Sequence, residues 1–185
     1  MKMWSGRFRQ GLDPEFEKWQ RSFGYDQRLL PFELAASRAH ARALEHSGVL
    51  SSEELAEILD GLSQVARLAE SSPEFLNDPE AEDVHHFVEK KLAALIGASG
   101  YKLHAGRSRN EQIATDLRLF VRAAIDDLQN LLADWIEAII ARAESAGAAA
   151  MPGFTHLQLA EPVLVAHWLL AYVEMFLRDS ERLAS

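Results

Sequence analysis

Two arginines and two small polar residues stand directly before a long segment with helical periodicity. Gly106, Arg107, Ser108, Arg109 and Asn110 follow one another in the chain. The first turn of a helix leaves backbone N–H groups unpaired and carries the positive end of the helix dipole. Guanidinium and polar side chains at that end would form a receptor for carboxylates. A second interpretation stays open, in which Ser108 or Asn110 only caps the helix and the arginines are solvated.

A second polar segment, MPGFTHLQ at 151–158, joins the two longest helical patterns. Its proline and glycine favour a tight connection that would present Thr155, His156 and Gln158 together. A loop histidine can act as a general acid or base near neutral pH, and a neighbouring threonine hydroxyl can bind a carboxylate. The alternative is a plain helix-joining turn whose histidine is solvated.

A third cluster, at 82–89, holds two histidines and three acidic residues. His85 and Glu89 are four residues apart, so on a helix they share one face and could pair or bind a metal. We interpret this face as solvated and held by a salt bridge, because no third ligand and no H-E-x-x-H order is evident. The sequence therefore predicts no metal site. Polar groups near Ser22 indicate nothing specific by themselves.

Almost every periodic segment has the helical period, which predicts an all-α fold. We expect helices over 13–21, 31–46, 51–69, 82–96, 111–146 and 162–183, with a loop at 71–79. Three of the ten glycines lie between residues 97 and 106, which predicts a domain boundary there. It separates a small N-terminal helical domain, 1–106, from the start of a central long-helix bundle, 107–185. The apolar bands on 111–146 are too wide for one partner helix, which indicates oligomerisation or further chain.

Composition excludes several classes of function. The 185 residues carry a net charge of -9, so no global basic footprint for nucleic acid or an anionic membrane exists. The absence of cysteine excludes disulfides, thiolate metal sites and a cysteine nucleophile. The N-terminus lacks the apolar run of a secretory signal, so the expected location is cytoplasmic. No P-loop, dinucleotide-binding glycine pattern or EF-hand occurs.

Several motifs occur together in an order and spacing typical of one family. They are WSGRF at 4–8, SRAH at 37–40, EDVH at 82–85, KLHAGRSRNEQIATDLRL at 102–119, PGFTHLQ at 152–158 and RDSERL at 178–183. Together with the Ser22 to Leu29 region and His167, they closely resemble the N-terminal portion of the argininosuccinate lyase family, in the aspartase/fumarase superfamily. The resemblance runs along the whole chain.

The resemblance implies a carbon–nitrogen lyase of arginine biosynthesis. The reaction is a reversible anti-elimination that splits argininosuccinate into arginine and fumarate. A base removes a proton beside a carboxylate, the carbanion is stabilised as an aci-carboxylate, and an acid protonates the departing guanidinium nitrogen. No metal or organic cofactor is expected. We expect this chain to hold a truncated version of the family's fold, which consists of the N-terminal domain and the first two long helices of the bundle.

The resemblance also assigns roles to individual residues. Ser22 is similar to the family's N-terminal substrate-binding serine, and Arg109 and Asn110 are similar to the pair that holds the succinyl carboxylates. Thr155 resembles the carboxylate-binding threonine, and His156 resembles the active-site histidine of acid–base catalysis. The supporting residues are Ser108 and Gln158.

The chain departs from the family in one large respect. Family members continue well past this length, and their mobile loop with the catalytic serine has no G-S-S-x-M-P-x-K-x-N-like counterpart here. Family active sites are also assembled from several subunits of a homotetramer. We therefore expect a homo-oligomer, and no appreciable activity from these residues alone. Two alternatives stay open: an adenylosuccinate-type or other fumarate-releasing lyase, and a non-catalytic helical structural or interaction protein recruited from the family.

Overall fold

A computed structural model describes residues 11–185 of the chain. The chain divides into two compact units, one that ends at Phe120 and one that runs from Val121 to Ser185. Helix α7, Arg109–Ala146, runs through this limit. The domain boundary expected after residue 106 lies just before α7 begins, ahead of the limit between the two units. It stays a prediction.

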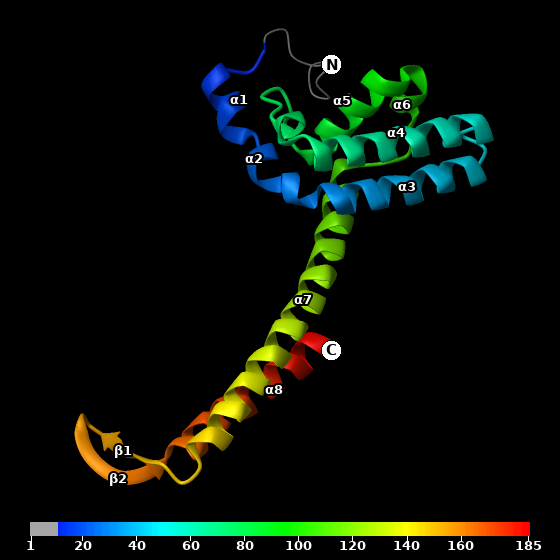
Figure 1. Cartoon of the computed structure of the whole chain (residues 1–185). Coiled ribbons are helices and arrows are strands. Elements are labelled where there is room, and N and C mark those ends of the chain that lie inside the picture. Colours follow the sequence, from blue (N-terminus) through cyan, green and yellow to red (C-terminus); the bar gives the residue numbers. More distant parts are fainter. Residues whose placement is uncertain (1–10) are drawn as a thin grey trace. The chain divides into compact units, whose positions relative to one another are not determined.

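The first unit is built from helices (Figure 1), as the predicted all-α class requires. Its α-helices are α1 (Pro14–Gln20), α2 (Phe23–Asp26), α3 (Leu30–His46), α4 (Ser52–Ser71), α5 (Val84–Ile96), α6 (Ala98–Lys102) and the first turns of α7. Short 3-10 turns are η2 (Gln27–Leu29) and η3 (Pro73–Leu76). The helices expected at 13–21, 31–46, 51–69 and 82–96 are thus present, with shifts of a few residues at their ends.

Side-chain caps explain where several helices begin. Asp13 caps α1 and accepts the N–H groups of Glu15 and Phe16 at 3.0 and 3.1 Å. A capping box begins α4, because Ser51 and Glu54 each accept the other's backbone N–H. Each such cap satisfies donors that the helix itself leaves unpaired, which typically contributes about 1 kcal/mol.

The core of the first unit lies where α3, α4 and α5 pack together. Its buried apolar residues include Leu34, Leu44, Ile58, Leu62, Val65, Val84, Phe87, Val88 and Leu92. Phe87 is its centre, since it stacks on Phe23 at 4.6 Å and meets Phe75 edge-on at 5.5 Å between ring centroids. Gly61 allows α4 to approach α5, because a Cβ there would lie 2.6 Å from Leu92 Cδ1.

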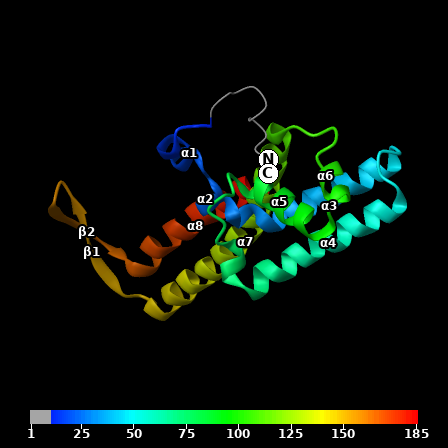
Figure 2. The ribbon, with the colours of Figure 1, turned by 90° about the horizontal axis from the view of Figure 1, so that it is seen from above.

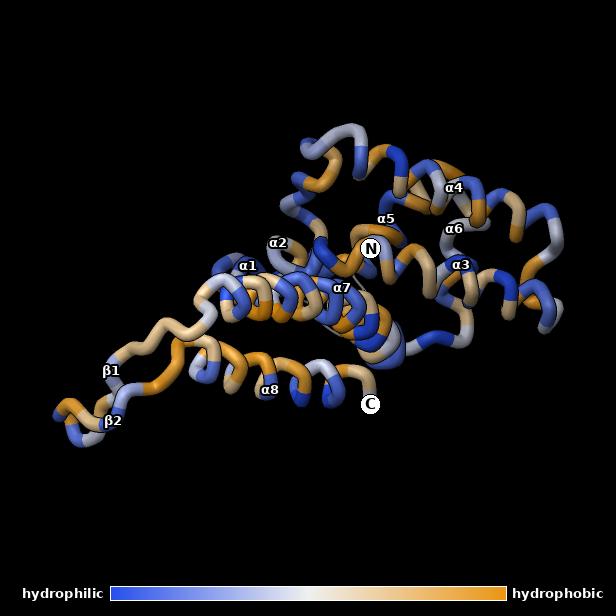
Figure 3. Tube along the Cα trace, turned by 60° about the horizontal axis from the view of Figure 1, so that its bottom comes forward, coloured by the Kyte–Doolittle hydropathy of each residue, from blue (hydrophilic) through white to orange (hydrophobic). Residues whose placement is uncertain are grey.

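The second unit consists of the remainder of α7, a β-hairpin and α8 (Val165–Ala184). Helix α8 turns back along α7 (Figure 2). Within this unit Ile139, Ala143 and Val173 are buried. Most other large apolar side chains on both helices are exposed, and the tube in Figure 3 shows the apolar stretch that opens α8. No helix among residues 11–185 combines the length and apolarity that a membrane span requires.

The hairpin is where the expectation from sequence was wrong. Instead of a loop at 151–158 and a helix from 162, the chain forms strands β1 (Ala150–Thr155) and β2 (Gln158–Leu164). They pair antiparallel, with Pro152 opposite Pro162 and a register shift just after Pro152. A Cβ at Gly153 would lie 2.5 Å from the Glu161 carbonyl oxygen, so this approach needs glycine. Both strands are largely exposed, so the sequence shows no apolar–polar alternation.

The Phe87→Ala substitution tests the position of the core. We expect it to lower the free energy of unfolding of the chain by about 3–5 kcal/mol, since it removes a fully buried ring and its two aromatic contacts. Urea unfolding followed by circular dichroism measures the loss. The exposed aromatic residue Tyr101 of α6 is the matched control. Its replacement by alanine should change the free energy of unfolding by less than about 0.5 kcal/mol, and an equal loss in both variants would contradict this core.

Candidate active site

The start of α7 shows how the two interpretations of its sequence combine. The Ser108 hydroxyl accepts the backbone N–H of Asn110 at 3.4 Å, and the Ser108 carbonyl accepts that of Gln112. Ser108 therefore caps the helix. The side chain of Asn110 is exposed on the first turn, where the helix dipole favours an anion. Capping and an available amide donor coexist at this end.

The Arg109 guanidinium is held by carboxylates of the chain itself. Its Nε lies 3.4 Å from Asp83 Oδ2, and its Nη1 lies 3.2 Å from Glu89 Oε1. Nη1 also donates to Gln112 Oε1 at 3.2 Å, and only 14% of the side chain is exposed. Two acidic groups thus balance the charge of Arg109 and tie α7 to α5. That Arg109 also binds a substrate carboxylate stays a prediction.

Ser22 lies at the start of α2, close to the segment that leads into α5. Its hydroxyl donates to Asp26 Oδ2 at 2.5 Å, and its backbone N–H donates to the Glu82 carbonyl at 2.9 Å. Burial raises the pKa of the Asp26 carboxyl, against the lowering effect of the Ser22 hydrogen bond. The motif at 82–85 therefore holds both Ser22 and, through Asp83, Arg109.

The interpretation of His85 as part of a solvated face was wrong. His85 is 2% exposed, and its Nδ1 lies 2.8 Å from Glu33 Oε2 and 3.5 Å from Asp116 Oδ2. It shares the buried stripe of α5 with Val88 and Leu92, so packing of α5 turns it inward. The expected partner, Glu89, instead accepts from Arg109 and lies 3.0 Å from His104 Nδ1.

Sequence reasoning missed Glu33 and Asp116, although a signal for Glu33 exists. Glu33 occupies a position on α3 whose neighbours on the same face, Leu30, Leu34 and Ser37, are all buried. A charged residue at an inward position needs partners, so it marks a polar cluster. One ligand atom each from Glu33, His85 and Asp116 lies within 4.8 Å of the others, a grouping that could hold a cation.

The histidine segment forms the tip of the hairpin. Thr155 pairs with Gln158, and the two residues between them, His156 and Leu157, have φ angles of 50° and 62°. Two consecutive left-handed residues are typical of a type I′ turn, which normally uses glycine or asparagine. Leu157 is 95% exposed and gains no burial in return. The turn is strained, and it presents Thr155, His156 and Gln158 at the surface.

The predicted site residues fall into two groups. Ser22, Ser108, Arg109 and Asn110 belong to the first unit, and the hairpin residues Thr155, His156 and Gln158 belong to the second. Within the first group, α5 and the residues just before it connect Ser22 to Arg109. Within the second, the turn brings all three polar side chains to neighbouring positions.

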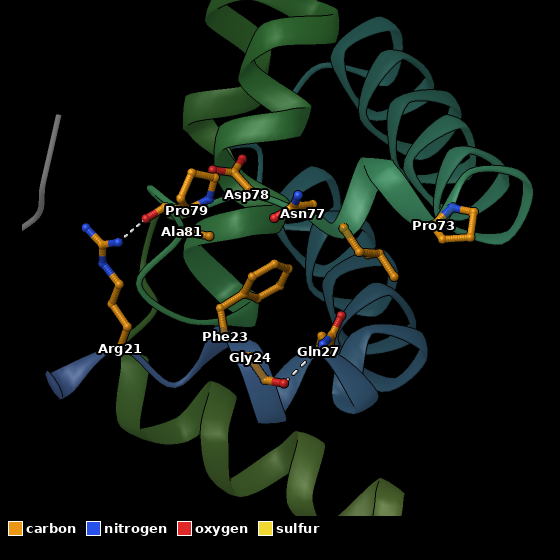
Figure 4. Close-up of a pocket in the computed structure, with 10 residues that line it drawn as sticks. Arg21, Phe23, Gly24, Gln27, Pro73, Asn77, Asp78, Pro79 and Ala81 are labelled. Atoms are coloured by element: carbon orange, nitrogen blue, oxygen red, sulfur yellow. Dashed lines mark hydrogen bonds between the residues drawn. The ribbon is translucent and has the colours of Figure 1, made fainter. Parts of the chain in front are cut away.

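The first unit also has a cleft of about 420 Å³ (Figure 4), which is lined by none of these residues, although Arg21 and Phe23 on either side of Ser22 belong to it. Phe23 and Ala81 form part of its wall, and Arg21 closes one side by donating to the Pro79 carbonyl. Asp78 is already paired with Lys90 and Lys91 at 3.0 Å. The charged groups that line this cleft are thus engaged in structural contacts, so the motif residues remain the better candidates for chemistry.

Comparisons with known proteins agree with the motifs. A family model described as lyase matches residues 6–185. The argininosuccinate lyase of Koribacter versatilis is 65% identical over 184 residues, and that of Acidobacterium capsulatum is 58% identical over 188 residues. The alignments cover 100% and 99% of this chain but 39% of each relative. The chain thus spans well under half the length of the curated relatives it matches.

Solved structures share the fold. A variant of EDDS lyase with bound fumarate superposes with a TM-score of 0.72 at 27% identity, over 95% of this chain and 35% of that one. A fumarate lyase from a Mesorhizobium species has the same fold at 21% identity and a TM-score of 0.66, over 96% of this chain and 41% of that one. These likenesses confirm the predicted fold class.

The family model covers nearly the whole chain, and its match defines the class: the chain belongs to the lyase family. Within that family its sequence is similar to argininosuccinate lyases, which confirms the resemblance that the motifs indicated.

The strain of the hairpin turn is open to measurement through Leu157→Gly. Glycine adopts φ angles near +60° without steric cost, so this change should stabilise the hairpin by about 1 kcal/mol. We expect the hydrogen-bonded amides of β1 and β2 to exchange about fivefold more slowly with solvent deuterium.

Leu159→Gly is the matched control, since Leu159 is also exposed but lies in β2. Glycine there should speed exchange, because it only adds freedom to the open strand. Faster exchange in both variants would mean that the turn is unstrained.

Proposed function

We propose that the chain supplies part of the active site of an argininosuccinate lyase, which splits argininosuccinate reversibly into arginine and fumarate. The observation that carries the choice of substrate is the 65% identity to the Koribacter versatilis argininosuccinate lyase along 100% of this chain. The related EDDS lyase structure was solved with fumarate bound, which is consistent with release of the same product.

In this proposal the first unit binds substrate carboxylates. Asn110 is the primary donor, because its amide is exposed on the first turn of α7 and no side chain of the described residues engages it. Arg109 lies at the same helix end, and its pairs with Asp83 and Glu89 fix the position of its guanidinium beside a substrate carboxylate. The Ser22 hydroxyl donates its hydrogen to Asp26, which leaves its oxygen to accept from an N–H group of the substrate. Donors fixed before substrate arrives stabilise developing charge without reorganisation.

The second unit supplies the proton-transfer group. His156 is exposed at the tip of the hairpin, so its imidazole is free to meet a substrate. It takes part in acid–base catalysis, while the Thr155 hydroxyl beside it binds a carboxylate and Gln158 supports the turn from the opposite strand. Backbone strain retained at an exposed turn is often associated with function, and the left-handed His156 and Leu157 fit that pattern.

We further propose that the long helices associate with copies of the same chain. Exposed apolar residues on α7 include Val121, Leu128, Leu131 and Trp135, and those on α8 include Trp168, Leu170, Met175 and Leu177. Apolar faces of this extent are typical of helices that pack against further helices. Sedimentation of the chain measures this, and a well-behaved monomer would contradict it.

Fumarate release, followed by its ultraviolet absorbance, tests the reaction. The 185 residues alone should show no appreciable turnover, and adding the remaining segment of the Koribacter versatilis relative should restore it. His156→Ala should then lower kcat/KM by about 10²–10⁴-fold, the usual contribution of a general acid or base. Asn110→Ala should lower it by about 10–100-fold through loss of a charged hydrogen bond.

Two exposed residues of the same types serve as controls. His46→Ala and Asn77→Ala lie away from the proposed site and should leave the restored activity within about twofold. Turnover by the isolated chain would overturn the expectation of inactivity. If the restored activity acted on adenylosuccinate rather than argininosuccinate, the proposed substrate would be wrong. If no combination showed lyase activity, the non-catalytic alternative would be favoured.

A further inference from the structure

The Asp116 carboxyl presents an electrostatic problem that the proposed lyase activity does not address. Asp116 is fully buried in the first unit, and neither of its side-chain oxygens accepts a hydrogen bond from the residues that the structure describes. A bare carboxylate in such a place would cost several kcal/mol in lost hydration. Something must neutralise it.

The groups around Asp116 come from three helices and one loop. Glu33 lies on α3, His85 on α5, and Arg107 just before α7, with its Nη2 3.6 Å from Glu33 Oε1. Asp26 of α2 is a further titratable neighbour of His85, and burial raises the pKa of its carboxyl. Arg107 balances one of the two carboxylates, Glu33 and Asp116, so the described residues leave this pair one positive charge short unless a further proton or cation is bound.

Hydrogen-bond geometry decides where that charge resides. His85 Nδ1 has a single hydrogen, and it serves Glu33 at 2.8 Å rather than Asp116 at 3.5 Å. Glu33 Oε1 already accepts from Ser37 at 2.6 Å and from Gln112 at 3.5 Å. Among the described groups, a hydrogen on Asp116 itself is what gives this carboxyl a hydrogen bond that it can make, as a donor to Glu33.

We infer that Asp116 binds a proton and donates it in a hydrogen bond to Glu33, which leaves the buried cluster without net charge and locks α7 to α3 and α5. A divalent cation would also fit the donor set, but with Arg107 beside it the cluster would keep an excess positive charge. The proton is the better match to the charges present.

The pKa values of the two acids agree with this assignment. Burial, with the charge of Glu33, raises the pKa of Asp116 to about 8. Burial also raises the pKa of Glu33, but hydrogen bonds from His85 and Ser37 outweigh it and bring that pKa below its ordinary value. The pair thus holds one proton across a wide range of pH, on the Asp116 side.

The cluster is connected to the proposed carboxylate-binding end of α7. Gln112 donates to Glu33 with its amide nitrogen and accepts from Arg109 with its amide oxygen. Loss of the proton would place a second negative charge beside Glu33 and disturb this chain of contacts. If the proposed function is right, Arg109 and Asn110 therefore bind the substrate carboxylate more weakly once Asp116 loses the proton.

The sign of the pH dependence follows from the raised pKa. An unfolded aspartic acid releases its proton near pH 3.8, whereas Asp116 in the folded chain keeps it up to about pH 8. The stabilising effect is complete below the first value and is lost as pH rises to the second. Over that interval the unfolding equilibrium constant should rise by up to about tenfold per pH unit.

Asp116→Asn in the 185-residue chain tests the inference without any lyase assay. The introduced amide can donate to Glu33 but cannot ionise, so urea unfolding should lose most of its dependence on pH between about 5 and 8. The exposed Asp127 of α7 is the control, and Asp127→Asn should keep the wild-type dependence. An Asp116→Asn variant with unchanged pH dependence would overturn the shared proton.

Infrared spectroscopy provides a second readout that needs no stable Asp116 variant. At neutral pH the chain should show the carbonyl stretch of an un-ionised carboxyl group, and that band should survive in Asp26→Asn. Absence of the band would overturn the inference. So would Zn²⁺ or Mn²⁺ raising the melting temperature of the unaltered chain but not of Asp116→Asn, because a cation would then occupy the place of the proton.

Discussion

The buried carboxylate of Glu33 is the constraint on which the first unit depends. A charge in an apolar core must be surrounded by donors or it destabilises the fold by several kcal/mol. Glu33 meets that requirement by contacting Ser37 from its own helix, His85 from α5, Gln112 from α7 and Arg107 from the loop between. These contacts fix how the three helices meet, in a way that the interchangeable apolar side chains around them could not.

The same network positions the groups with chemical potential. Gln112 connects Glu33 to Arg109, and Arg109 in turn pairs with Asp83, which begins the helix that carries His85. Ser22 is connected to the same network because its backbone N–H donates to the Glu82 carbonyl. The exposed amide of Asn110 thus sits on a helix end that is held from several sides, which is what a preorganised anion receptor needs. The second unit works differently, since its hairpin projects Thr155 and His156 from a strained turn without a buried support.

Particular elements show how far sequence reasoning reaches. The helices were predictable because caps and apolar stripes are local signals, as Ser51 with Glu54 and the stripe of α4 demonstrate. The hairpin was not, because two exposed strands with paired prolines leave no alternation and the turn uses His156 and Leu157 where glycine is typical. Membership of the lyase family was also accessible, since ordered motifs such as GRSRN and PGFTH survive in the chain independently of their geometry.

The sequence alone determined the all-α class, the candidate site residues and the family, because these depend on residue types and on spacing along one helix or loop. Only the tertiary structure decided which side chains are buried together. His85 lies four residues from Glu89, yet it pairs with Glu33, fifty-two positions away, because the packing of α5 on α3 turns it into the core. Arg109, which spacing alone could have left solvated, likewise pairs with Asp83 and Glu89. Long-range partners of a charge are set by how helices pack, and that information is not contained in local spacing.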